Sequence, residues 1–228
     1  MMGVLSATIL ALVIWAWMDY RNWIALGAGG LPSNPYGWSQ VTWMRLGKHD
    51  PLSTSVFEKN IGKDWDVRGL GDLPKRAGTR PQVDPHPIPH RQTDQFGDEQ
   101  VRREQKQIFD DVIAENAALL YYQKSIFERH NDAVFLREPA KGNSNTKAQG
   151  EVGHIHPSDG SMHMTLSPSD AKKVIGAGWG ELHPLTEETG RLPSTYMMIY
   201  SPRSQEENAV VEQILRAAVK FAVGNPQK

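Results

Sequence analysis

Four histidines gather in the C-terminal third of the chain, at positions 154, 156, 163 and 183. Two runs with the alternation of β-strands, Val152–Pro157 and Ser161–Leu166, flank Asp159-Gly160. Asp-Gly between alternating runs is typical of a two-residue hairpin turn. That turn places His156 opposite His163. Because side chains alternate between the two faces of a strand, His154 then lies on the same face as these two.

Three imidazoles on one strand face can do chemistry, because directly opposed residues have Cβ atoms about 4.5–5.5 Å apart. Such a cluster can share protons around a substrate, or hold a Zn, Fe, Cu or Mn ion. No carboxylate lies at a tight ligand spacing, and the turn needs Asp159, which favours proton transfer. A divalent metal held by His154, His156 and His163 is the alternative, and a polar sheet face without function is another. His183 follows Gly178-Trp-Gly180 and is the fourth candidate.

Two arginines could bind an anionic substrate. Arg80 lies in an irregular segment and Arg203 directly follows a predicted strand, where binding sites are often built. A guanidinium holds a carboxylate or enolate through two parallel hydrogen bonds. The alternative for each arginine is a salt bridge that ties its loop.

Several function classes are excluded. Lys and Arg number 25 and Asp and Glu 26, so no large positive field is available for nucleic acid. The chain has no Cys, which removes disulfides and thiolate chemistry and leaves the redox compartment open. No G-x-S-x-G, Walker A or G-x-G-x-x-G motif supports a serine hydrolase or a nucleotide site.

The elements around the histidines predict an α+β fold with a small, mainly antiparallel sheet, in which the hairpin and further strands pack with helices. An amphipathic spacing predicts a helix from Asp98 to about His130. Ser167-Pro168 opens a second helix that Gly176 and Gly178 close, and Ser204 begins a third. Strands are expected at 133–136 and 195–200.

The first eighteen residues carry no charge, and as a helix they would span roughly 27 Å. No basic residue precedes Val4, which argues against a signal peptide. Arg21, Arg45 and Lys48 follow the run, so we expect a single-pass membrane anchor with a cytosolic C-terminal domain. A buried core helix is the alternative.

Three segments are therefore expected: an anchor and interfacial segment at 1–26, an irregular connection at 27–64 and an α+β domain at 65–228. The irregular character continues to about residue 97, because Asp84–His90 has Pro at every second position.

Three motifs together carry a family resemblance: Glu151–His163, Gly178–Leu185 and Tyr200–Arg203. They resemble the fungal luciferase-like family, as does an upstream block at Leu73–Pro81 with His86 and Arg91 beyond it. The likeness covers roughly residues 65–224, and the apolar N-terminus is also similar to that of the luminous enzymes.

The resemblance implies a luciferase-like oxygenase without an organic cofactor. Luminous members oxidise 3-hydroxyhispidin, a styryl α-pyrone, with O2 through a peroxide that loses CO2. The expected partner is thus a phenolic or α-pyrone small molecule. The catalytic candidates are His154, His156, His163 and His183, with His163 as the acceptor of the enol proton. The substrate-binding candidates are Arg80, Arg203, Tyr200, Trp179 and His86.

Two other functions stay open. One is a metal-dependent hydrolase or lyase in which the three-histidine face activates water. The other is a non-catalytic, membrane-tethered binding module that has kept the fold.

Overall fold

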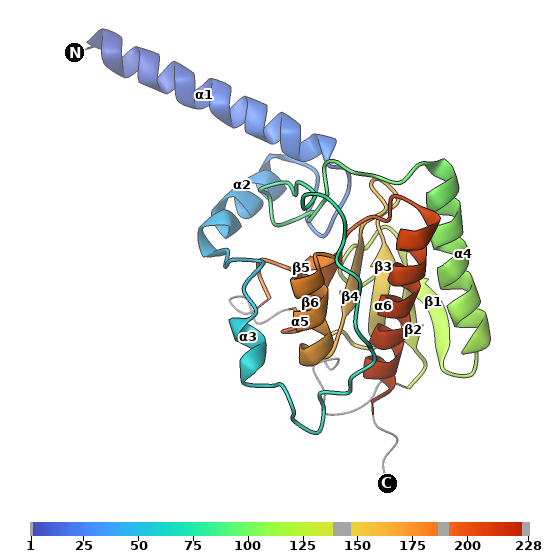
Figure 1. The fold of residues 1–228 in the computed structure, drawn as a ribbon. Helices are drawn as coiled ribbons and strands as arrows, with labels where there is room; N and C mark the ends of the chain where they lie inside the picture. Colours follow the sequence, from blue (N-terminus) through green and yellow to red (C-terminus); the bar gives the residue numbers. More distant parts are fainter. Residues whose placement is uncertain (1, 139–146, 187–191, 225–228) are drawn as a thin grey trace.

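The computed structural model describes residues 2–138, 147–186 and 192–224 (Figure 1). The elements in chain order are α1 (Met2–Ala25), α2 (Pro35–Met44), the 3-10 helix η1 (Arg45–Gly47), α3 (Ser55–Glu58), α4 (Glu99–Glu115), β1 (Leu120–Lys124), β2 (Asp132–Leu136), β3 (Glu151–Ile155), β4 (Met162–Thr165), α5 (Pro168–Ala177), β5 (Gly180–Leu182), β6 (Tyr196–Ile199) and α6 (Gln205–Val223).

The strands form one six-stranded sheet in the order β1-β2-β3-β4-β6-β5. Every neighbouring pair is antiparallel, which confirms the predicted α+β class and its mainly antiparallel sheet. In Figure 1, α5 and α6 lie across one face of the sheet and α4 runs beside α6. This face holds the hydrophobic core.

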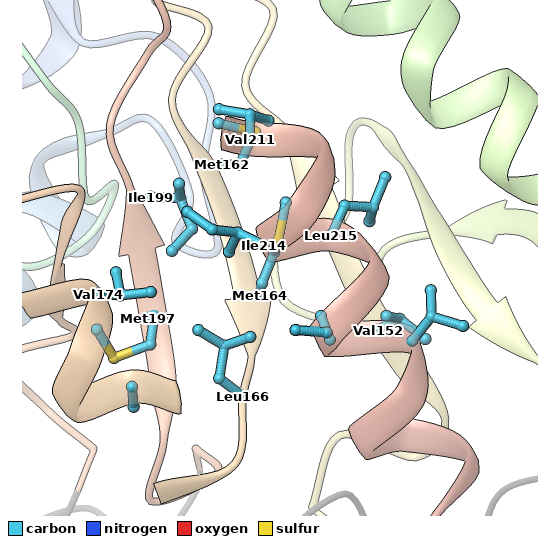
Figure 2. Packing of buried hydrophobic residues seen from close by; sticks show 14 of the residues in the cluster. Val152, Met162, Met164, Leu166, Val174, Met197, Ile199, Val211, Ile214 and Leu215 are labelled. Carbon is cyan, nitrogen blue, oxygen red and sulfur yellow. The ribbon is translucent and has the colours of Figure 1, made fainter. Parts of the chain in front are cut away.

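Helix α6 supplies a large part of that core. Its spacing of three and four residues turns Val211, Ile214 and Leu215 toward the sheet, where they meet Met162 and Met164 (Figure 2). Each of these side chains is fully buried. The predicted cap is confirmed, because the side chain of Ser204 accepts a hydrogen bond from the backbone N–H of Glu207. The core therefore lies on the sheet face opposite to the histidines.

The predicted helix from Asp98 to His130 is too long. Helix α4 begins after its cap Asp98 but ends at Glu115, and Leu120–Lys124 form the edge strand β1. The backbone N–H of Leu120 bonds to the carbonyl of Asn116 to make the turn between them. Strand β1 then pairs with β2. The apolar residues keep a helical spacing beyond residue 115, but the hydrogen bonds between these two strands decide the structure there.

The second face of the sheet is covered by the proline-rich chain, by the end of α1 and by the residues after it. Trp23 donates a hydrogen bond to the carbonyl of Ile88 at 2.8 Å, and Arg91 donates one to the carbonyl of Ala28 at 3.0 Å. The region 27–64, expected to be irregular, contains α2, η1 and α3. Long-range hydrogen bonds thus order this coil over the histidine face.

The membrane span expected at the N-terminus finds no support. Among the residues that the structure describes, no helix is long and apolar enough to cross a membrane. Helix α1 runs to Ala25, and its last third carries Asp19, Arg21 and Asn22 and is tied to the body. Asp19 accepts hydrogen bonds from Trp38 and Arg45, and Trp23 is buried. These contacts cross the expected boundary at residue 26.

Replacing Ile214 by Ala should lower the free energy of unfolding by about 2–5 kcal/mol, because a fully buried side chain leaves a cavity against the sheet. Urea unfolding followed by circular dichroism measures this. The control Gln213→Ala lies on the exposed side of α6 and should change stability by less than about 0.5 kcal/mol. Equal effects of the two changes would contradict the packing of α6 described above.

Candidate functional site

A row of side chains crosses the sheet on the face away from the core. His154 on β3 pairs with His163 on β4, and His163 pairs with Met198 on β6. Ala133 on β2 and Glu181 on β5 extend the row at its two ends. Residues paired in neighbouring strands point to the same face, so two imidazoles and one carboxylate share this surface.

The hairpin register differs from the prediction by two residues. His154, not His156, lies opposite His163, and residues 156–161 form the connection between β3 and β4. Asp159 accepts a hydrogen bond from the backbone N–H of Ser161 at 2.9 Å, and Gly160 has a φ of +73°. This Asx-type turn widens the loop. A shift of two residues leaves every side chain on its predicted face, whereas a shift of one would have exchanged the faces.

The structure brings the three predicted histidines together. The ring centroids lie 5.2 Å apart for His154 and His156, 5.4 Å for His154 and His163, and 4.7 Å for His156 and His163. Nε2 of His156 lies 3.0 Å from Nδ1 of His163. All three side chains are buried. His183 lies on the other side of His163, with ring centroids 5.6 Å apart.

The nitrogens that point away from the cluster are fixed by other side chains. Nδ1 of His154 lies 2.6 Å from Oε1 of Glu151, and Nδ1 of His156 lies 2.8 Å from the hydroxyl of Ser161. The register of β3 against β2 skips Val152, and this irregularity brings Glu151 to the histidine face. Each imidazole is therefore held in a defined orientation.

His163 is connected to a second carboxylate through His90. Nε2 of His163 lies 3.3 Å from Nδ1 of His90, and Nε2 of His90 lies 3.0 Å from Oε1 of Glu181. The hydroxyl of Tyr200 donates to the second oxygen of Glu181 at 2.8 Å. A connected path of polar groups thus runs from Tyr200 to His163.

A third carboxylate, Glu128, completes the cluster. Arg91 donates to both of its oxygens, at 3.0 and 2.7 Å, and both side chains are buried. Oε1 of Glu128 also lies 3.7 Å from Nε2 of His156. One ligand atom each from Glu128, His154, His156 and His163 can be chosen so that all lie within 4.8 Å of one another. This set could hold a metal ion, and His90, His163 and His183 form a second such group.

Burial determines the charge of these rings. It lowers the pKa of His156, His163 and His183 well below the usual value, and neighbouring Arg91 lowers that of His156 further. The three rings are therefore neutral at pH 7. Burial also raises the pKa of the hydroxyl of Tyr196, which stacks on His163 with ring centroids 4.7 Å apart. Neutral imidazoles can accept a proton or bind a metal ion.

A cavity of about 400 Å³ lies over part of this face. Its wall includes His90, His163, His183, Tyr196 and Phe127. The hydroxyl of Tyr196 is buried and has no hydrogen-bond partner within the described part of the chain. The cavity thus combines aromatic surface with imidazoles, as binding sites for small aromatic molecules do.

None of the five predicted substrate-binding residues lines this cavity. Arg80 donates to the carbonyls of Gly180 and Ile175 and, with Tyr200, lines a separate cavity of about 440 Å³. The guanidinium of Arg203 pairs with Glu207 at the start of α6.

The other two fix loops. Trp179 donates to the carbonyl of Pro74 at 2.7 Å, and His86 lies between Asp84 and Asp19. Arg80 and Arg203 therefore hold their own loops in place through contacts within the protein, which was the alternative to binding a substrate anion.

Sequence reasoning missed His90, Glu128, Glu151 and Glu181. His90 ends the alternating Pro segment, which reads as coil, and its partner Glu181 lies 91 residues further along the chain. Glu151 lies three residues before His154, but regular alternation places it on the opposite face. Only the irregular register of β3 could have indicated it.

The chain resembles characterised proteins over nearly its whole length. A family model described as "Luciferase domain" matches residues 149–218. A luciferase of Neonothopanus nambi is 30% identical over 239 residues, covering 98% of this chain and 87% of that protein. Luciferases of Armillaria ostoyae and Armillaria gallica are each 29% identical over 221 residues, covering 91% of this chain and 82% of theirs. No solved structure matches.

Replacing Arg91 by Met should lower the free energy of unfolding by about 3–5 kcal/mol, because it leaves the buried carboxylate of Glu128 without its partner. Adding Glu128→Gln should restore part of the loss, since the uncompensated charge is then gone. Urea unfolding in a buffer with chelator measures both.

The matched control breaks an exposed pair. Arg103→Met removes the partner of Glu99 on α4, where both side chains are solvated, and should cost no more than about 0.5 kcal/mol. A loss at Arg91 as small as that at Arg103 would show that the buried pair is not needed for stability.

Proposed function

This chain belongs to the family of fungal luciferases, and on that premise we propose that it is an oxygenase acting on a 3-hydroxyhispidin-type α-pyrone or a related enolisable polyketide lactone. In the proposed reaction both atoms of O2 add to the pyrone and one carbon leaves as CO2. All electrons come from the pyrone, so no reductant or organic cofactor is required. Emission of light is a separate property that depends on how the excited product decays.

The observation that carries the proposal is the aromatic cavity over neutral, buried histidines in a chain about 30% identical to a fungal luciferase. A planar styryl pyrone suits a space of about 400 Å³ with Tyr196 and Phe127 in its wall. The hydroxyl of Tyr196 stays protonated and has no partner among the described residues, so a shift of the ring would let it donate to an oxygen of the pyrone. A site with little water also protects a peroxide from hydrolysis.

Proton transfer from the enol is assigned to His90 rather than to His163. Both ring nitrogens of His163 contact other imidazoles, those of His156 and His90. His90 also lines the cavity. Its Nδ1 is the nitrogen that meets His163, and its Nε2 faces the carboxylate of Glu181, so of the two rings only His90 has a carboxylate partner. A carboxylate in this position orients an imidazole and stabilises the imidazolium that forms when the proton arrives.

One alternative has its own support in the geometry. The ligand set of Glu128, His154, His156 and His163 also suits activation of water, as in a metal-dependent hydrolase or lyase. Lactone opening without O2 uptake would favour that function. Binding of the pyrone without turnover would favour a binding module.

Replacing His90 by Gln should lower kcat for O2 uptake with 3-hydroxyhispidin by about 10²–10⁴-fold, with little change in KM, because it removes the proton acceptor. An oxygen electrode and CO2 detection measure the reaction. The exposed His130 is the matched control, and His130→Ala should leave both constants unchanged. Wild-type protein that neither consumes O2 nor releases CO2 with this substrate would refute the proposed function.

Replacing Tyr196 by Phe should raise KM by about 2–12-fold, which corresponds to one lost hydrogen bond of about 0.5–1.5 kcal/mol. Arg203→Lys should leave KM unchanged, because Arg203 binds Glu207 and does not line the cavity. A KM that rises for Arg203→Lys and not for Tyr196→Phe would mean that the pyrone binds elsewhere.

A further inference from the structure

We propose that His154, His156, His163 and Glu128 bind a divalent transition-metal ion at the edge of the cavity. The ligand atoms are Nε2 of His154, Nε2 of His156, Nδ1 of His163 and Oε1 of Glu128. The proposal rests on side-chain geometry and does not depend on the reaction proposed above.

The spacing of the four side chains fits one ion. Two ligands at about 2.1 Å from a tetrahedral ion lie about 3.4 Å from each other. Nε2 of His156 lies 3.0 Å from Nδ1 of His163 and 3.7 Å from Oε1 of Glu128. Ligand atoms of all four residues lie within 4.8 Å of one another, so small side-chain rotations complete the coordination.

His154 gives an independent indication of a ligand. Its side chain is buried, and its Nε2 has no hydrogen-bond partner among the described residues. Its other nitrogen, Nδ1, is held by Glu151 at 2.6 Å. A buried polar atom without a partner is unfavourable in a folded protein, and a metal ion would satisfy it.

Metal-binding histidines usually give their other ring nitrogen to a carboxylate, carbonyl or water, and His154 does so with the carboxylate of Glu151. Glu151 holds His154 and is itself fixed by Ser125 and by the backbone N–H of Ile126. Ser161 holds His156, and His90 lies against His163. All three imidazoles therefore have their outer nitrogen occupied and their inner nitrogen directed into the cluster.

The chemical class of the ion follows from the donors. Three imidazoles and one carboxylate suit Zn, Fe, Cu or Mn rather than Ca or Mg, which prefer oxygen. Arg91 already neutralises Glu128, so the ion would keep its positive charge. His163 and Glu128 also line the cavity, so this charge would lie beside any anion bound there.

The test uses the full chain, stripped with chelator and then titrated with Co²⁺, whose visible absorption reports its coordination. We expect one Co²⁺ ion to bind per chain. Its visible absorption should be that of Co²⁺ held by few ligands, most of them nitrogen. His154→Gln should abolish this binding. Glu151→Gln keeps all four ligands but loosens His154, and should weaken binding about 10–100-fold. His130→Ala, at the surface, should bind as wild type does.

His183→Gln separates the two possible ligand groups, because His183 belongs only to the group with His90 and His163. Binding should survive this change. Loss with His183→Gln but not with His154→Gln would overturn the assignment, as would the absence of saturable Co²⁺ binding. If circular dichroism shows that His154→Gln does not fold, the test rests on Glu151→Gln. An unchanged affinity of that variant for Co²⁺ would overturn the proposal. Oxygen uptake is measured separately, so failure of either proposal is visible without the other.

Discussion

The burial of several imidazoles beside one another is the constraint on which the rest of the site depends. A buried, charged ring would be costly, and adjacent charged rings would repel, so His156, His163 and His183 are neutral. A neutral imidazole has one donor and one acceptor, and each needs a defined partner. Glu151, Glu181 and Ser161 provide such partners at the periphery. The protein thus fixes the direction of each ring by fixing its outer nitrogen.

That requirement explains features of the fold that are otherwise irregular. The skipped residue Val152 is part of the core, and the irregularity lets Glu151 reach the opposite face. The loop at 156–161 returns Ser161 to His156. The proline-rich segment cannot form a helix or a central strand, but it places His90 over the sheet and excludes water from it. Local departures from regular structure therefore occur where ring nitrogens need partners.

The sequence predicted those parts of the site that depend on local periodicity. Alternation placed His154, His156 and His163 on one face even though the register was wrong by two residues, because the period of a strand is two. The caps at Ser167 and Ser204 were predictable for the same local reason. What the sequence could not predict depends on contacts far apart in the chain.

Those distant contacts decide which of the polar residues belong to the site. Glu181 meets His90 across 91 residues, whereas Arg203, which looked like a substrate clamp, meets Glu207 only four residues away.

The arrangement separates two kinds of histidine, and this separation has a chemical consequence. His154 lies in the row on β3 and His156 directly follows that strand, and neither lines the cavity, whereas His90 and His183 do. Only His163 belongs to both groups. The proposed ion site and the proposed proton acceptor therefore use different ring nitrogens. Glu181 holds the outer nitrogen of His90, and Glu151 holds that of His154, so one ring in each group is oriented by a carboxylate.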